Sequence, residues 1–188
     1  KEDAWEEYES VMFPVTFLVD EEISKRAERY VNNGGKLIIT YGSGIADSCE
    51  HVYLGGYPGA FCKLLGVRIE EFVAIDKGHK VSLSNGWEGE MWVAEISEEC
   101  RILSSIEDAA GDESLVGQPV VTERKVGEGS AFYIGTKLGK QDATEFFSKY
   151  IFKKQDKFVG DDIAPLCIQR VHGNQVFEFV FNRSQDTS

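Results

Sequence analysis

The sequence is poor in the residues on which most metal and redox centres depend. Its 188 residues include four cysteines and three histidines, and no two cysteines form a C-x-x-C pair. A zinc ribbon or a thioredoxin-type centre is therefore not expected, and no H-x-x-x-H pair provides a helical metal site. A metal site would require these residues to converge in space, so we predict neither a metal nor a cofactor.

Long apolar runs and an excess of basic residues are also missing. No stretch reaches 18 apolar residues, and no basic-then-apolar signal peptide opens the sequence. Lys and Arg number 20 against 32 Asp and Glu, which gives a net charge of −12. Because such a surface repels phosphate and anionic lipid, we expect no nucleic acid and no membrane as partner. Cysteines that stand singly and far apart fit a reduced, cytoplasmic protein.

The apolar content is high enough for a folded core. Hydrophobic residues make up 42% and aromatic residues 12% of the chain, which excludes intrinsic disorder. The first part predicts a βαβ unit, with a strand over residues 11–13, a helix over 20–33 and an apolar strand over 36–41. Asp20 is a favourable N-cap for that helix, and a glycine pair ends it.

The remaining elements are shorter and read mainly as strands. A glycine-rich loop over residues 42–57 leaves the carboxyl end of the second strand, and a short helix over 58–65 follows it. Further predicted elements are strands at 72–75, 80–83, 91–96 and 101–105, a hairpin of 119–126 with 130–135, a helix at 141–154, and strands at 163–171 and 175–181. We therefore expect an α/β domain at 1–154 and the start of a small β domain at 155–188, since two strands alone are marginal in water.

None of the catalytic motifs that we tested fits the sequence. Ser43 follows a buried strand, but a nucleophile elbow requires glycine at the positions of Tyr41 and Ile45. Cys49 lies in mid-loop and Cys62 on an amphipathic helix, so neither has the setting of an amidotransferase cysteine. The phosphate-binding glycine patterns are absent, and acidic pairs in so acidic a chain carry no information. We expect no catalytic residue in this chain.

One combination of motifs, in residues 34–72, is specific. It runs from a glycine pair through a buried strand to T-Y-G-S-G-I-A-D, then L-G-G-Y-P-G and L-L-G-V-R-I-E-E-F. This combination resembles the trimerisation domain of family-42 glycoside hydrolases, the bacterial β-galactosidases. L-V-G-Q-P at 115–119 and G-E-G-S-A-F-Y-I-G-T at 127–136 are similar to that family as well. The tail at 163–182 resembles the start of the family's C-terminal β domain.

The resemblance implies a fold for this chain, and it implies that catalysis takes place on a different domain. The fold would be α/β, a three-layer flavodoxin-like or class I glutamine amidotransferase-like domain with a mostly parallel sheet, followed by a partial small β domain. Because the family's domain usually opens with another strand–helix unit, we expect a piece of a longer chain that lacks this unit. The catalytic glutamates would lie on a separate (β/α) barrel. The chain itself would be a non-catalytic trimerisation domain of an enzyme that hydrolyses terminal non-reducing β-D-galactose residues.

The loop at 42–57 is the candidate surface for subunit contact. Loops at the carboxyl ends of strands carry the binding surfaces of doubly wound sheets, and this one mixes aromatic with polar side chains, as interfaces do. The candidate interface residues are Ile45, Asp47, His51, Tyr53, Leu54 and Tyr57. The partners would be other subunits of a homotrimer and the enzyme's own barrel domain. Alternatively, these residues pack on the domain's own helix at 58–65.

Two other classes of function stay open. An autonomous amidotransferase-like enzyme would require a reactive cysteine with a low pKa. A sugar-binding module would require a cleft with exposed tryptophan, for which the candidates are Trp5, Trp87 and Trp92.

Overall fold

The computed structural model describes residues 4–90, 92–98, 100–109, 112–152, 166–172 and 175–181. The chain divides into two compact units, Lys1–Ala143 and Thr144–Ser188, and each is described by itself. Within the part so described, every helix is too short or too polar to cross a lipid bilayer.

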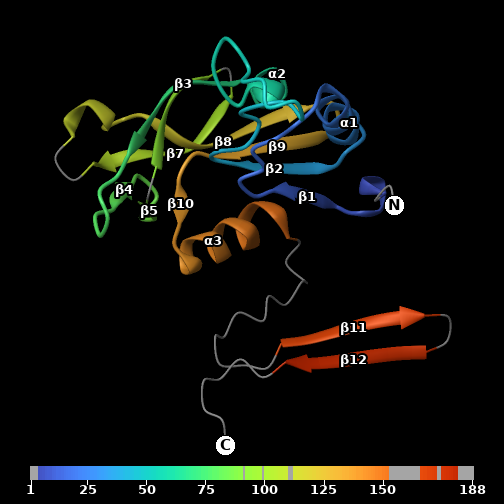
Figure 1. The fold of residues 1–188 in the computed structure, drawn as a ribbon. Coiled ribbons are helices and arrows are strands. Elements are labelled where there is room, and N and C mark those ends of the chain that lie inside the picture. Colours follow the sequence, from blue (N-terminus) through green and yellow to red (C-terminus); the bar gives the residue numbers. More distant parts are fainter. Residues whose placement is uncertain are drawn as a thin grey trace, which may run out of the picture. The chain divides into compact units, whose positions relative to one another are not determined.

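The first unit is mainly a curled sheet with few helices (Figure 1). Its strands are β1 (Ser10–Phe13), β2 (Lys36–Thr40), β4 (Val81–Leu83), β5 (Glu88–Glu90), β7 (Arg101–Asp108), β8 (Pro119–Val126), β9 (Gly129–Ile134) and β10 (Lys137–Leu138). They lie in the order β1-β2-β9-β8-β7-β4-β5-β10. A separate two-stranded ribbon consists of β3 (Val67–Ala74) and β6 (Trp92–Glu98). The α-helices among the described residues are α1 (Glu21–Asn32), α2 (Cys62–Leu65) and α3 (Lys140–Phe146), with 3-10 turns at Trp5–Glu7, Gly59–Phe61 and Glu113–Leu115.

The predicted βαβ unit is confirmed. Strands β1 and β2 pair in parallel, with Ser10 opposite Lys36, and α1 connects them. Strand β9 pairs in parallel with the other edge of β2, with Lys36 opposite Ser130. A parallel pair requires a long crossover, and the amphipathic α1 supplies it for β1 and β2.

The predicted fold class is wrong. Only the pairs β1–β2 and β2–β9 of the eight-stranded sheet are parallel, and all its other pairs are antiparallel. The sheet is mixed and β-rich, so it is not a three-layer, mostly parallel flavodoxin-like or amidotransferase-like fold. The physical reason lies in the connections after β2. Strands β8 and β9 are joined by a tight turn at Gly127, and β4 and β5 by a turn at Gly86, and such short turns can join only antiparallel neighbours.

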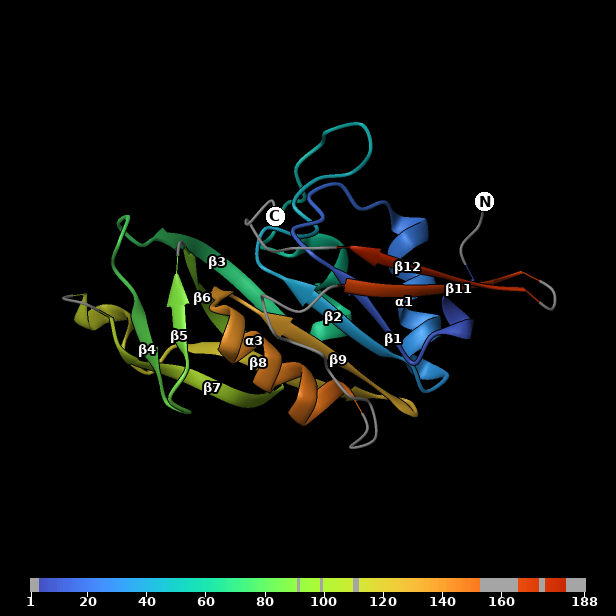
Figure 2. The same cartoon turned by 90° about the horizontal axis from the view of Figure 1, so that it is seen from below.

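Helices α1 and α2 cover the same face of the parallel strands (Figure 1 and Figure 2). Side chains alternate along a strand, so Leu37 and Ile39 of β2 point to this face with Tyr133 of β9. The main core is formed by Val19, Ala27, Tyr30, Val31, Leu37, Ile39, Phe61, Leu64, Leu65, Val67, Ile69, Ala131 and Tyr133. The core therefore holds the carboxyl ends of β1 and β2 in fixed positions.

Asp20 does not cap α1 as the sequence predicted. Its side chain makes no cap hydrogen bond, although it directly precedes the helix. Its Oδ1 accepts instead from the backbone N–H of Ser48 at 2.8 Å. Asp20 thus ties the start of α1 to the loop at 42–57.

Several other boundaries differ from the sequence prediction. Strand β3 begins at Val67, five residues before the predicted start, and β5 was not predicted. Helix α3 ends at Phe146 and is followed by a π-helical turn at Phe147–Ile151, so the predicted helix to 154 is shorter. The predicted hairpin of β8 and β9 is confirmed.

The second unit contains an antiparallel hairpin. Strand β11 (Leu166–His172) pairs with β12 (Gln175–Phe181), with His172 opposite Gln175. Residues 163–165 of the predicted strand and the predicted turn residues Gly173 and Asn174 lie outside the described residues. The proposed boundary at 154–155 lies outside them too, so the assignment to a small β domain stays a prediction.

Candidate functional site

The loop at 42–57 is an ordered layer at the carboxyl ends of β1 and β2. The backbone N–H of Gly44 donates to the carbonyl of Thr16 at 2.9 Å, and that of Val19 donates to Ala46 at 2.9 Å. On the other side, the N–H of Tyr53 donates to the carbonyl of Ile45 at 3.0 Å. Three short extended segments, 16–19, 44–47 and 51–53, therefore lie side by side.

Two buried hydroxyls fix the segment that follows β1. Thr40 Oγ1 accepts from the N–H of Val15 at 2.8 Å, and Ser43 Oγ accepts from the N–H of Thr16 at 3.0 Å. Ser43 Oγ also donates to the carbonyl of Phe13 at 3.1 Å. With only 2% of its surface exposed, Ser43 joins backbone segments and is not placed to act as a nucleophile.

Val15 is held in a strained backbone conformation. Its φ is +48°, in the left-handed region that β-branched residues rarely adopt. Such strain costs about 1–3 kcal/mol and persists only where surrounding contacts impose it. The hydrogen bond from Val15 to Thr40 is one such contact, and it keeps the half-exposed Val15 side chain at the surface.

An apolar hollow opens between these segments. Its volume is about 310 Å³, and it is lined by Val15, Phe17, Tyr41, Gly42, Ile45, Tyr57 and Phe72. The Tyr57 and Phe72 rings pack together, with centroids 5.5 Å apart. Large apolar side chains also stand exposed on the two segments that supply most of this lining, residues 15–18 and the loop at 42–57. We define the apolar face as this hollow together with the exposed side chains Val15, Phe17, Leu18, Val52 and Leu54.

The six interface residues predicted from the sequence fall into two groups. Asp47 is half-exposed, His51 is exposed, and Leu54 is 96% exposed. The other three, Ile45, Tyr53 and Tyr57, are buried or half-buried. Asp47, His51 and Leu54 are therefore accessible to a neighbouring subunit. The three less exposed residues contribute mainly to the shape of the surface.

Tyr53 serves the domain itself. Its hydroxyl donates to the carbonyl of Val19 at 2.6 Å, and its ring lies against Gly59, where any Cβ would collide with it. The alternative, in which the loop residues pack on the domain's own helix at 58–65, therefore holds for Tyr53. It does not hold for Leu54, whose side chain is exposed.

The sequence reading missed the part of the apolar face that follows β1. Val15, Phe17 and Leu18 are all more than 40% exposed, and Tyr41 and Phe72 line the hollow. In the sequence this segment shows only as an apolar run directly after a strand that ends at a proline. Such a run is equally typical of core, so it does not mark these residues as exposed.

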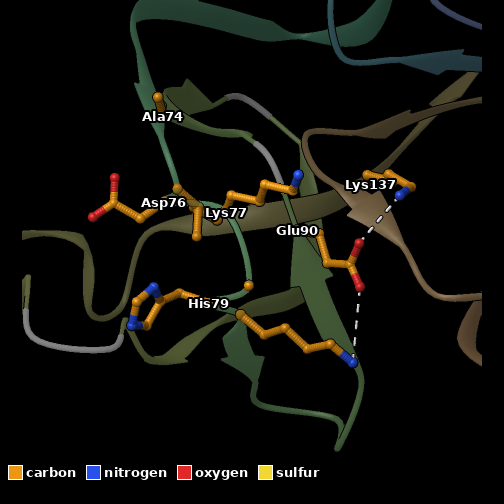
Figure 3. Close-up of a pocket in the computed structure, with 9 residues that line it drawn as sticks. Ala74, Asp76, Lys77, His79, Glu90 and Lys137 are labelled. Carbon is orange, nitrogen blue, oxygen red and sulfur yellow. Dashed lines mark hydrogen bonds and ion pairs between the residues drawn. The ribbon is translucent and has the colours of Figure 1, made fainter.

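A second, larger pocket lies at the other end of the sheet and is charged (Figure 3). It measures about 530 Å³ and is lined by residues 74–80 with Glu90 and Lys137. Glu90 pairs with Lys137 at 3.1 Å and with Lys80 at 3.8 Å. Figure 3 shows Lys137 beside Glu90, with a dashed line joining their charged groups, while Asp76 and His79 lie away from Glu90. The hydrogen bond and charge of Lys137 lower the pKa of Glu90, so this carboxylate stays ionised.

Cys62, Trp5 and Trp87 do not supply the sites that the two alternative classes of function require. Burial raises the pKa of the Cys62 thiol, which is the opposite of activation. Trp87 is buried, and the Trp5 ring packs edge-on against Phe13 with Arg26 over it at 4.4 Å. The Trp92 side chain lies outside the described residues.

Comparison with known proteins gives the family. The family model of the β-galactosidase trimerisation domain matches residues 1–156. β-Galactosidase LacA of Lactobacillus acidophilus is 35% identical over 193 residues, which cover 98% of this chain and 28% of that protein. β-Galactosidase LacZ of Heyndrickxia coagulans is 35% identical over 188 residues, covering 97% and 28%. The chain belongs to the β-galactosidase trimerisation domain family, and it spans about 28% of the length of these curated relatives.

Solved structures show the same fold within larger chains. The β-galactosidase from Bacillus circulans sp. alkalophilus superposes with a TM-score of 0.78 at 25% identity, covering 96% of this chain and 28% of that one. The GH42 β-galactosidase Gan42B gives a TM-score of 0.82 at 26% identity, covering 98% and 28%. The mixed sheet is therefore shared with these enzymes.

Proposed function

We propose that this chain holds together the subunits of a trimeric β-galactosidase, and that the apolar face meets a neighbouring subunit. Membership of the trimerisation family supports the first part. One observation carries the second: Val15 and Phe17, which line the apolar hollow, are 51% and 52% exposed, and Leu54 of the loop at 42–57 is 96% exposed. Monomeric soluble proteins rarely expose large contiguous apolar patches, and larger ones mark interaction sites.

Burial of this face supplies the energy for association. Covering a Leu or Phe side chain fully is worth roughly 1.5–3 kcal/mol. A threefold arrangement uses heterologous contacts, so the apolar face meets a different surface of the next subunit or of its barrel domain. The three predicted residues that are accessible, Asp47, His51 and Leu54, lie at the rim of that contact in this proposal.

Catalysis belongs to another part of the parent enzyme in this proposal. The parent hydrolyses terminal non-reducing β-D-galactose residues, as the names of the relatives support, on a barrel domain outside this chain. Ser43 and Cys62 are engaged in structure, which supports a non-catalytic role. Cys49 and Cys62 form no disulfide, which fits a reducing compartment, so we place the parent in the cytoplasm.

Two measurements test the proposal. Sedimentation velocity of the parent enzyme should give a trimer, and the 188-residue chain alone should release no galactose from a β-galactoside. A monomeric parent would contradict the assembly role. Turnover by the isolated chain would contradict the absence of catalysis.

A further inference from the structure

The turn at residues 47–51 brings three potential metal ligands together. A carboxylate oxygen of Asp47, the Sγ of Cys49 and a ring nitrogen of His51 all lie within 4.8 Å of one another. Asp47 Oδ2 and His51 Nδ1 are 3.2 Å apart. The sequence predicted no metal, because no two histidines stand at a helical ligand spacing such as H-x-x-x-H. Here a tight turn, not a helix, makes the three side chains converge.

The backbone of this turn holds Asp47 in place. Its Oδ1 accepts from the N–H groups of Cys49 and His51, both at 2.9 Å, which leaves Oδ2 directed toward the imidazole. The N–H of Asp47 donates to the carbonyl of His51 at 3.0 Å, and Asp20 Oδ1 accepts from the N–H of Ser48 at 2.8 Å. Ligating carboxylates are commonly oriented by such outer hydrogen bonds. The carboxylate is thus ordered before any ion arrives.

We propose that Asp47, Cys49 and His51 bind one divalent transition-metal ion of the zinc type, with a fourth position left to water. A tetrahedral ion with bonds of ~2.0 Å to oxygen and nitrogen separates those two atoms by ~3.3 Å, close to the spacing present here. Thiolate and imidazole favour zinc, cobalt or nickel over magnesium and calcium.

An ion pair alone does not account for the cluster. An exposed histidine–aspartate pair contributes only about 0–1 kcal/mol and does not involve Cys49. A catalytic cysteine–histidine pair is a poorer account, because Cys49 and His51 are both exposed on the turn, with no enclosing cavity among those described. A three-ligand surface site uses all three side chains. Asp47 and His51 also lie at the rim of the proposed subunit contact, but the site needs no residue of another subunit.

Cobalt titration of the chelator-treated 188-residue chain tests the site. We expect one equivalent of Co²⁺ to bind, with a thiolate-to-cobalt charge-transfer absorption that Zn²⁺ abolishes and Mg²⁺ leaves unchanged. Cys49→Ser should remove this absorption, and His51→Ala should weaken binding at least about tenfold. His79→Ala, which removes another exposed histidine, should bind like the parent chain.

The cobalt titration can support or overturn the proposed metal site. Circular dichroism of each variant confirms that the fold is retained. An absence of the charge-transfer absorption in the unaltered chain would overturn the site. Equal Co²⁺ binding by the folded Cys49→Ser and His51→Ala variants would overturn it as well.

Discussion

Two concave surfaces of the first unit lie at opposite ends of the sheet order and differ in chemistry. The hollow near β1 and β2 is apolar and measures about 310 Å³, while the pocket near β5 and β10 is charged and measures about 530 Å³. Covering the first removes hydrocarbon from water, whereas covering the second strips water from paired ions, which costs several kcal/mol per ion. The smaller concavity therefore fits the proposed subunit contact better than the larger one does.

The largest effect is expected when charged side chains are placed in the apolar face. Phe17→Asp together with Leu54→Asp in the parent enzyme should raise the trimer dissociation constant by at least about a hundredfold, or roughly 2.7 kcal/mol, because buried unpaired carboxylates are strongly unfavourable. Sedimentation equilibrium measures the constant. Both side chains are largely exposed in this chain, so circular dichroism should show an intact fold. A trimer that tolerates both substitutions would refute the assignment of this face.

The shape of the apolar face depends on the close approach of Tyr53 to Gly59. A methyl group at position 59 would collide with Cβ and Cγ of Tyr53. Gly59→Ala should therefore lower the free energy of unfolding by about 1–3 kcal/mol, as measured by urea denaturation. Gly139→Ala is the matched control, since its Cβ would meet only Asp142 at 3.6 Å. Equal stability of the two variants would show that Tyr53 does not anchor the loop.

The charged pocket provides a weaker test of the comparison. Lys137→Met removes the closest cation from the half-exposed Glu90. Because exposed ion pairs are worth little, the free energy of unfolding should change by less than about 1 kcal/mol and the trimer should persist. Calorimetry and sedimentation measure the two quantities. Dissociation of the trimer would move the interface to this pocket.

The smallest effect concerns pH and the turn at 47–51. The hydrogen bond from the His51 backbone is the main cause that lowers the pKa of Asp47. Because the pKa of Asp47 is lowered, its carboxylate stabilises the turn fully at pH values above the ordinary aspartate pKa of about 3.9. This stabilisation is lost as the pH falls through the lower pKa of Asp47 in the folded chain. Protection of the Cys49 and His51 amides against hydrogen exchange should therefore fall in acid. Asp47→Asn should abolish this pH dependence, and an unchanged one would disprove its origin in Asp47.

Sequence patterns predicted the local parts of the fold better than its topology. The βαβ unit could be predicted from the apolar stripe of α1, formed by Ala27, Tyr30 and Val31, and from the apolar run of β2. Both signals depend on residue spacing alone. The direction of the later strands depends on short turns such as that at Gly86, near the unpredicted β5. The predicted fold class followed the family resemblance and was wrong, because the antiparallel pairing implied by such turns, including the predicted hairpin of β8 and β9, was not carried into it.

The candidate site was predicted only in part for a similar reason. The loop at 42–57 could be singled out because it follows a buried strand. Phe17 and Leu18 could not, since an apolar run gives no sign of whether it faces core or solvent. The convergence of Asp47, Cys49 and His51 was missed because it depends on backbone hydrogen bonds that the sequence does not display.

The central claim is that the apolar face is covered by a neighbouring subunit. Hydrogen–deuterium exchange of the trimeric parent, compared with the isolated 188-residue chain, tests it most directly. We predict slower exchange in the trimer at residues 15–18 and 51–57, with no change at residues 74–80 of the charged pocket. Equal exchange of the first two segments in both samples would contradict the account.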